Sequence, residues 1–288
     1  ELARPLATPA PTSAIAAPNN GADNYFQDEG VNPREKTVFD NLSTFGLDVD
    51  TASYTLTKEY IAGGSLPPYE AVRAEEIINA IDQGYAAPEN AAFTLYADGA
   101  LSPFARRGVH LLRIGVQGYR VSARERKDAH LTFVIDISGS MGMENRLALV
   151  KDSLRELVYR LDEKDSVAIV VYGSDARVVL ETTAGSDTER ILRAIDSLNP
   201  EGATNVQAGL ELGYRLAFEH FQNGENNRVI LCSDGVANVG ATNPDSLVDW
   251  VRGYVDEGIS LVTIGFGMGN YNDGLMERLA DGGDGSYH

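Results

Sequence analysis

Side chains that offer oxygen ligands recur at three places in the sequence. An Asp, a Ser and a second Ser alternate with other residues directly after an apolar run, a Thr follows Gly-Ala further on, and another Asp ends a later apolar run. Oxygen-only donors select a hard cation such as Mg²⁺, with Mn²⁺ or Ca²⁺ as alternatives. The pattern therefore predicts a metal site made of five side chains: Asp136, Ser138, Ser140, Thr204 and Asp234.

The charge of this donor set indicates what else the metal would bind. Only Asp136 and Asp234 are charged, so the protein ligands just balance a divalent ion. Mg²⁺ keeps several waters in its octahedral shell, and an outside carboxylate can replace one of them. We therefore expect the site to be completed by an Asp or Glu of a protein partner.

The elements that carry these residues alternate regularly from residue 129 onward. Apolar strands are expected at 131–136, 166–172, 177–181, 228–233 and 259–266, with amphipathic helices between them. Continuous apolar strands alternating with helices predict an α/β fold, a doubly wound and mostly parallel sheet flanked by helices. Ligands of such sheets bind at the carboxyl ends of the strands, near the switch in strand order, which is where Asp136 and Asp234 fall.

Three motifs resemble those of one family. Asp-Ile-Ser-Gly-Ser at 136–140, Gly-Ala-Thr at 202–204 and Ser-Asp-Gly at 233–235 are similar to the motifs of the von Willebrand factor type A domain, a Rossmann-like fold, across residues 129–288. The resemblance implies that the same five side chains form a metal-ion-dependent adhesion site. Its hydroxyls would be direct ligands, and its aspartates would act directly or through water. In this family a last strand is followed by a helix whose movement switches the metal site. Residues 129–288 are expected to stop short of both elements.

The first part of the chain differs in character. Residues 34–128 are predicted to form a smaller α+β domain, with helices at 54–62 and 71–81 and two strands after them. The segments 42–54 and 66–73 resemble the amino-terminal domain of a bacterial family of von Willebrand-type proteins. Members of that family are commonly exported or lipoprotein-like, which implies an extracytoplasmic place, at the bacterial cell surface or secreted.

The first 33 residues are rich in Pro and Ala and have little periodicity, so they are predicted to be a tail or linker. Any membrane contact would come through an anchor at this N-terminal end. No apolar stretch approaches the ~18 residues that a membrane-spanning helix needs.

Composition narrows the classes of partner. The chain has 24 Lys and Arg against 42 Asp and Glu, a net charge of −18, and such a surface repels nucleic acid and anionic lipid. The one cysteine excludes an internal disulfide framework and a Cys-rich zinc site. The partner is therefore expected to be a protein.

An enzymatic role is not expected, because no constellation supplies a nucleophile and a general base. Asp48-Val-Asp50 resembles the nucleophile motif of haloacid dehalogenase-type phosphatases, but no matching Lys and acidic pair follow, and a helix-capping turn explains it better. Two alternatives to an adhesion module remain open. One is a structural subunit of a surface complex or filament in which the metal is a brace. The other is a domain that serves an enzyme assembly.

Overall fold

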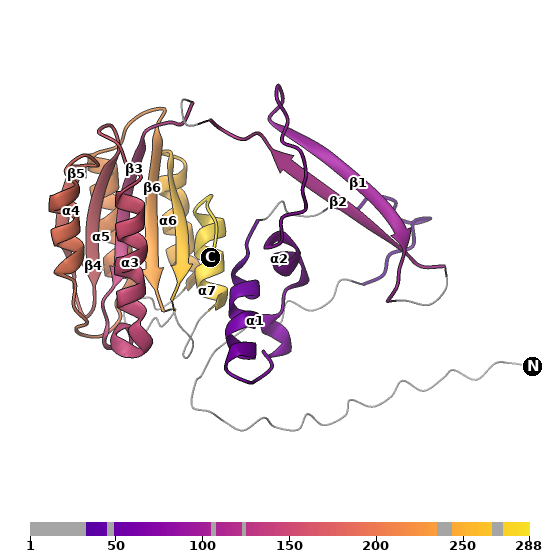
Figure 1. The fold of residues 1–288 in the computed structure, drawn as a ribbon, viewed down its shortest axis with the longest axis horizontal. Coiled ribbons are helices and arrows are strands. Elements are labelled where there is room, and N and C mark those ends of the chain that lie inside the picture. Colours follow the sequence, from indigo (N-terminus) through magenta and orange to yellow (C-terminus); the bar gives the residue numbers. More distant parts are fainter. Residues whose placement is uncertain (1–32, 45–48, 105–107, 123–124, 235–243, 267–272) are drawn as a thin grey trace, which may run out of the picture.

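The computed structural model describes residues 33–44, 49–104, 108–122, 125–234, 244–266 and 273–288, so nearly all of the tail predicted over 1–33 lies outside the described residues. Five strands form the main sheet in the order β5-β4-β3-β6-β7 (Figure 1). Their bounds are Ala129–Asp136 (β3), Ser166–Tyr172 (β4), Ala176–Ala184 (β5), Asn226–Ser233 (β6) and Ile259–Gly265 (β7). All five lie where the apolar runs predicted strands.

Strand β3 is the centre of this sheet. Strands β4 and β6 pair with it in parallel on either side, and β7 extends the parallel set beyond β6. Strand β5 pairs antiparallel with β4 because only three residues separate them, too few for the crossover that a parallel pair requires. The sheet is thus doubly wound and mostly parallel, as predicted, with the switch in strand order between β3 and β6.

Helices cover both faces of the sheet (Figure 1). Helices α3 (Arg146–Val158) and α4 (Thr188–Asp196) pack on the face to which Phe133 and Ile135 of β3 point. The other face carries α5, α6 and α7, which are Val206–Glu219, Pro244–Val255 and Asp273–Gly282. A sheet buried on both faces explains why its strands are apolar at successive positions rather than at alternate ones.

Two glycines allow α5 to lie close to the sheet. A Cβ added at Gly213 would lie 2.3 Å from Cγ2 of Val134, and one added at Gly209 would lie 2.5 Å from Cδ1 of Tyr172. Both distances are shorter than any real carbon–carbon contact. The bare backbone of α5 therefore fits over β3 and β4 where any side chain would clash.

An aromatic cluster joins α5 to α6. The ring of Trp250 in α6 meets Tyr214 of α5 edge-on, with their centroids 5.4 Å apart, and it also packs on Tyr254 at 5.0 Å. Edge-to-face pairs at these distances are favourable beyond the apolar area that they bury. Trp250 therefore has a packing role.

No helix in the described ranges has the length and apolar character needed to cross a bilayer.

The N-terminal region contains two short helices and a separate hairpin. Helix α1 is Ala52–Ala62 and α2 is Ala74–Asn79, preceded by a 3-10 turn at Tyr69–Ala71. The single helix predicted over 71–81 is wrong in its extent, because Val72 adopts an extended backbone conformation and interrupts it. Strands β1 (Phe93–Leu101) and β2 (His110–Gly118) pair antiparallel and stand apart from the main sheet (Figure 1).

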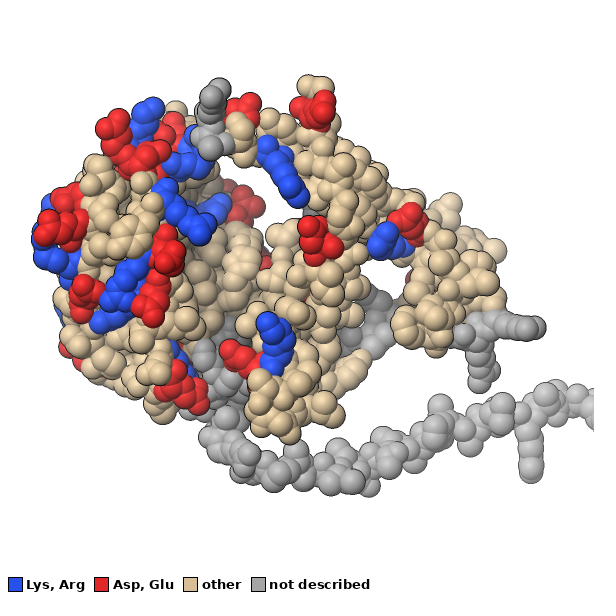
Figure 2. Space-filling model, in the orientation of Figure 1, with Lys and Arg blue, Asp and Glu red and all other residues tan. Residues whose placement is uncertain are grey.

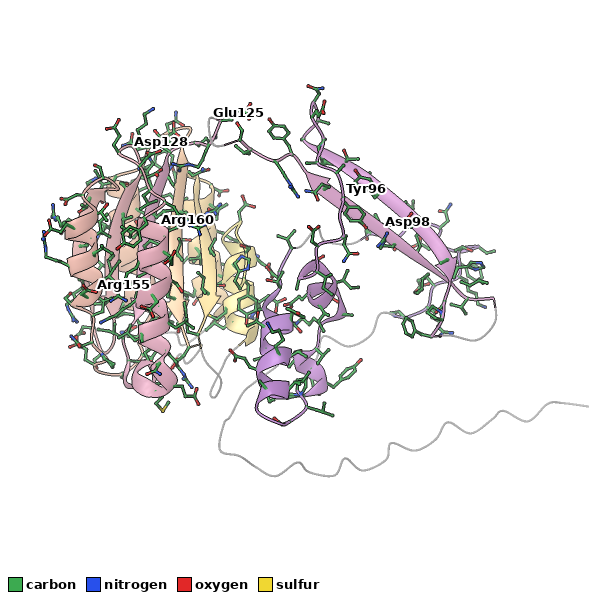
Figure 3. The ribbon with its side chains drawn as sticks, viewed as in Figure 1. Tyr96, Asp98, Glu125, Asp128, Arg155 and Arg160 are labelled. Atoms are coloured by element: carbon green, nitrogen blue, oxygen red, sulfur yellow. The ribbon has the colours of Figure 1, made fainter. Side chains whose placement is uncertain are left out.

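The hairpin depends on a few cross-strand contacts. Tyr85 stacks on Tyr96 at 4.6 Å, over Gly115, where a Cβ would collide with the Tyr85 ring. Arg113 of β2 donates a hydrogen bond to Asp98 of β1 at 2.6 Å; Figure 3 labels Tyr96 and Asp98 on that strand. Much of the hairpin's apolar surface is exposed, and Figure 2 shows few charged atoms over it. A two-stranded sheet of this kind has little stability of its own.

The N-terminal helices dock against the last elements of the main sheet. Arg73, just before α2, forms an ion pair with Glu277 of α7 at 2.8 Å, and both side chains are mostly buried. The same guanidinium reaches Glu76 of α2 at 2.8 Å. At the far edge of β7, Tyr287 forms a single parallel bridge with Thr263. The ion pair between Arg73 and Glu277 therefore joins the two regions.

Candidate metal site

The two carboxylates predicted as ligands lie at the same edge of the sheet. Asp136 is the last residue of β3, and Asp234 directly follows the neighbouring parallel strand β6. They are 0% and 1% exposed. Ser233, the last residue of β6, donates its hydroxyl to Oδ2 of Asp136 at 3.0 Å, which ties the two strand ends together.

The loop after β3 brings the two serines together. The backbone N–H of Ser138 donates a hydrogen bond to Oδ1 of Asp136 at 2.8 Å. This side-chain-to-backbone bond closes a tight turn directly after the strand. The hydroxyl oxygens of Ser138 and Ser140 then lie 3.0 Å apart. Ser138 is buried and Ser140 is half-buried, so one hydroxyl lines the interior while the other is near the surface.

Thr204 lies in the loop before α5, which packs against the loop after β3. The N–H of Gly139 donates to the carbonyl of Gly202 at 3.2 Å, which holds the loop before α5 against the loop after β3. Gly202 has φ +78°, and a Cβ there would lie 2.8 Å from the backbone nitrogen of Ser174, so only glycine fits. Thr204 itself is 2% exposed. In the described chain, no hydrogen bond joins its side chain to the other four predicted ligands.

The spacing of the hydroxyls suits a small hard cation. Neighbouring ligands of an octahedral Mg²⁺, with bonds of about 2.1 Å, lie about 3.0 Å apart, whereas Ca²⁺ bonds of about 2.4 Å spread them to about 3.4 Å. The hydroxyls of Ser138 and Ser140 are hydrogen-bonded to each other at 3.0 Å, a separation that also equals the spacing of neighbouring Mg²⁺ ligands. Within the described ranges, no three His, Cys, Asp or Glu side chains converge, and this strand-end cluster has only two carboxylates. A metal at this edge would depend on hydroxyls as well as on its two carboxylates.

The electrostatics of Asp136 also fit a cation. The pKa of this carboxyl is raised to about 6, because burial, with a smaller contribution from the negative charge of Asp234, outweighs the hydrogen bonds from Ser138 and Ser233 that lower it. A carboxylate is costly to bury in this way unless positive charge is brought close to it. A divalent cation between Asp136 and Asp234 would supply that charge.

A buried arginine that the three motifs do not indicate also belongs to this cluster. Arg146, the first residue of α3, is 4% exposed and donates from Nη1 to Oδ2 of Asp234 at 3.0 Å. Its Nη2 donates to Oε2 of Glu144, also at 3.0 Å. The signal was its position on the buried face of α3, four residues before Val150, in a helix whose apolar stripe was otherwise recognised.

Two family models match the chain. The von Willebrand factor type A domain matches residues 130–288, which covers the main sheet and the candidate site, and a second model, described as von Willebrand factor, matches residues 20–113. The first match alone covers more than half of the chain.

Relatives and solved structures agree with these matches. The uncharacterized protein YfbK of Escherichia coli K12 is 38% identical over 98% of this chain and 50% of its own length, so the chain spans about half of that relative. The human inter-alpha-trypsin inhibitor heavy chain H3 is 30% identical over 52% of this chain and 18% of its own length. A von Willebrand factor type A structure from Catenulispora acidiphila shares the fold, with a TM-score of 0.50 and 17% identity, over 68% of this chain and 45% of its own. The chain belongs to the von Willebrand factor type A domain family, whose domains generally mediate metal-dependent protein interactions.

Proposed function

We propose that this chain is a metal-dependent protein-binding module. Asp136, Ser138, Ser140, Thr204 and Asp234 hold a Mg²⁺ ion at the strand ends. When bound, the ion supplies a Lewis-acidic position that a carboxylate of the partner protein can occupy. The chain's own residues fix the ligand oxygens and choose the partner through the surface around them. The module is not an enzyme.

The spacing of the Ser138 and Ser140 hydroxyls is the observation that carries this proposal. Their oxygens lie 3.0 Å apart, at the distance of neighbouring Mg²⁺ ligands, beside two carboxylates that are almost completely buried. An extracytoplasmic place, as an adhesion protein at the cell surface, is supported by the Pro/Ala-rich composition of residues 1–33 and by the resemblance of the N-terminal segments to exported bacterial proteins.

Calorimetric titration tests the metal site directly. The wild-type chain should bind Mg²⁺ and Mn²⁺, and Ser140→Ala should bind each at least about tenfold more weakly, because a direct ligand is lost. Ser140 is half-buried, so this variant should still fold. Ser153→Ala, at an exposed position on α3, is the matched control. Wild-type protein that takes up neither ion would refute the metal site.

A capture experiment tests the partner. The immobilised chain is incubated with the surface fraction of its source in Mg²⁺, in EDTA, and as the Ser140→Ala variant, and the bound proteins are identified by mass spectrometry. The proposal expects a protein that is held by the wild type in Mg²⁺ and released in the other two conditions. Replacing candidate Asp or Glu residues of that protein by Asn or Gln should abolish capture. A partner held equally in all three conditions would contradict the role of the metal.

A second candidate function is that of a structural subunit of a surface complex or filament, with the metal as a brace. The β1–β2 hairpin favours it, because both strands have nine residues, pair only with each other among the described strands, and expose apolar side chains. Unpaired strand edges of this length readily accept another strand. Assembly that persists in EDTA would favour this reading over carboxylate capture.

A further inference from the structure

The ion pair between Arg146 and Asp234 is unusually buried. Their side chains are 3% and 0% exposed, and Nη1 of the arginine lies 3.0 Å from Oδ2 of the aspartate. Burying two charges is costly unless each has a partner in good geometry. Asp234 thus faces a positive charge that belongs to the protein itself.

The local sequence does not favour an arginine at this position. Arg146 opens α3, where the positive end of the helix dipole repels a cation. The two preceding residues, Glu144 and Asn145, have φ of 51° and 60°, a left-handed conformation that is uncommon away from glycine. A chain that keeps an unfavourable charge and two unfavourable backbone conformations has a compensating contact. Here that contact is the reach of Arg146 to Asp234.

Glu144 adjusts the strength of this counter-charge. Its carboxylate lies 3.0 Å from Nη2 of Arg146, but its side chain is 63% exposed, so water screens it more than it screens Asp234. The pKa of Glu59 in α1 is raised, mainly by burial and to a smaller extent by repulsion from the negative charge of Glu144. The exposed carboxylate of Glu144 therefore lies on one side of the guanidinium, and the buried carboxylate of Asp234 at the candidate site lies on the other.

We infer that Arg146 is a positioning residue of the metal site. It fixes the carboxylate of Asp234 and offsets one of the two negative charges that Asp136 and Asp234 bring to the site. This inference rests on the proposed function. Without Arg146, two carboxylates would neutralise a divalent ion. With it, the ion, the two aspartates and the guanidinium together carry one net positive charge, which the solvent-screened Glu144 offsets only in part. The site then binds metal less tightly than its oxygens alone would allow, and in exchange the bound ion attracts an anionic ligand more strongly.

Metal affinity provides the first test. Calorimetry with Mn²⁺ should show that Arg146→Gln binds the ion about tenfold or more tightly than wild type, because a nearby positive charge is gone. Arg146→Lys keeps the charge and should stay within about threefold of wild type. Arg215→Gln, at an exposed position on α5, changes the net charge equally and should leave affinity unchanged. A merely structural arginine would predict the opposite sign, since disorder at Asp234 weakens metal binding.

Ligand affinity provides the second test. With Mn²⁺ bound, acetate that displaces water from the ion is followed by the fall in water-proton relaxation. Acetate should bind the wild type and Arg146→Lys more tightly than it binds Arg146→Gln. Equal acetate affinity in all three would overturn the claim that the counter-charge favours an anion.

The two proposals fail in different ways. Wild-type Mn²⁺ binding that does not tighten in Arg146→Gln refutes the inference and leaves the metal-binding proposal intact. Absence of binding in both proteins refutes both. If Arg146→Gln does not fold, Glu144→Gln is the second variant. Without the Glu144 carboxylate, less negative charge faces the guanidinium from its exposed side, so Mn²⁺ should bind about threefold more weakly than in the exposed control Glu156→Gln. Equal affinities in those two would overturn the inference.

Discussion

The backbone N–H of Tyr287 donates a hydrogen bond to Oδ1 of Asp50 at 2.9 Å, which joins positions 237 residues apart. Both residues are almost completely buried. Asp50 belongs to the Asp-Val-Asp sequence that resembles a phosphatase motif, and the contact gives it a structural role instead. It holds the segment before α1 against the edge of β7.

Replacing Asp50 should reveal how much this contact contributes. Asp50→Ala leaves a buried N–H without its acceptor and should lower the free energy of unfolding by about 1.5–3 kcal/mol. Asp50→Asn keeps an acceptor oxygen and should lose less. Urea denaturation of both variants, with the exposed Asp40→Ala as control, checks this. Equal losses in Ala and Asn would show that the charge, and not the hydrogen bond, is what matters.

Ser233 should support the metal site without being a ligand. Its hydroxyl orients Oδ2 of Asp136, and loss of such supporting hydrogen bonds commonly weakens metal binding by about 10- to 100-fold. Ser233→Ala should therefore bind Mg²⁺ at least about tenfold more weakly in a calorimetric titration. Ser260→Ala, at the other end of the neighbouring strand β7, is the control. Unchanged affinity would remove Ser233 from the site.

Acid should destabilise the junction between the N-terminal region and β3 through Asp165. Arg126 donates to both carboxylate oxygens of Asp165, at 2.8 and 2.9 Å. Figure 3 labels Glu125 and Asp128, which flank Arg126 in the chain. Burial by itself raises the pKa of Asp165, but hydrogen bonds from Arg126 and from the N–H groups of Asp162 and Ala129 outweigh it, so the pKa is lowered.

The sign of the pH effect follows from that shift. The folded state binds a proton at Asp165 less readily than the unfolded state does, so its stabilisation is complete above pH ~4 and is lost as the pH falls through the folded pKa. Asp165→Asn should be less stable than wild type at pH 7, and the difference should shrink towards pH ~3. Thermal unfolding across this range measures it, with the exposed Asp175→Asn as control. A difference that does not change with pH would contradict the assignment.

Two glycines in different helices should respond in opposite ways to the same substitution. Gly213→Ala gains about 1 kcal/mol of helix propensity but forces a Cβ against Val134, at a cost of about 1–3 kcal/mol or more, so it should destabilise the fold. Gly253→Ala in α6 meets nothing within 4 Å and should stabilise it by up to about 1 kcal/mol. Urea denaturation of both variants compares them. A stabilising Gly213→Ala would mean that α5 can move away from the sheet.

Cys232 should be chemically silent in the folded chain. Burial raises the pKa of its thiol to about 12, and the residue is 2% exposed within β6. Ellman's reagent at pH 8 should label no thiol in the native protein and one thiol per chain after unfolding in guanidinium chloride. Rapid native labelling would show that β6 opens readily.

The main sheet was predictable because its residues carry local signals. Continuous apolar runs mark β3, β4 and β6, and every helix between them has a polar face and an apolar face. The direction of β5 depends on the three-residue link to β4, which apolar periodicity does not record. Helix α2 is shorter than predicted because Val72 takes an extended conformation within an otherwise amphipathic pattern.

The oxygen ligands of the candidate site were predictable from the sequence, but the buried positive charge of Arg146 beside them was not. Strand ends place Asp136 and Asp234 at one edge, and the alternating serines follow from the turn after β3. The approach of Arg146 is different, because it depends on two left-handed residues before α3 and on a carboxylate 88 positions away. Neither of these can be inferred from the spacing of residues along one helix.

The contact of Trp250 with Tyr214 gives the protein a built-in optical probe. Trp250 is the chain's single tryptophan, so fluorescence excited in tryptophan reports one place, the seam between α5 and α6. Helix α5 starts two residues after Thr204 and carries Tyr214 on its buried side. Any shift of α5 that accompanies ligand binding at the strand ends is therefore transmitted to the environment of one indole ring, and unlabelled protein is sufficient to follow it.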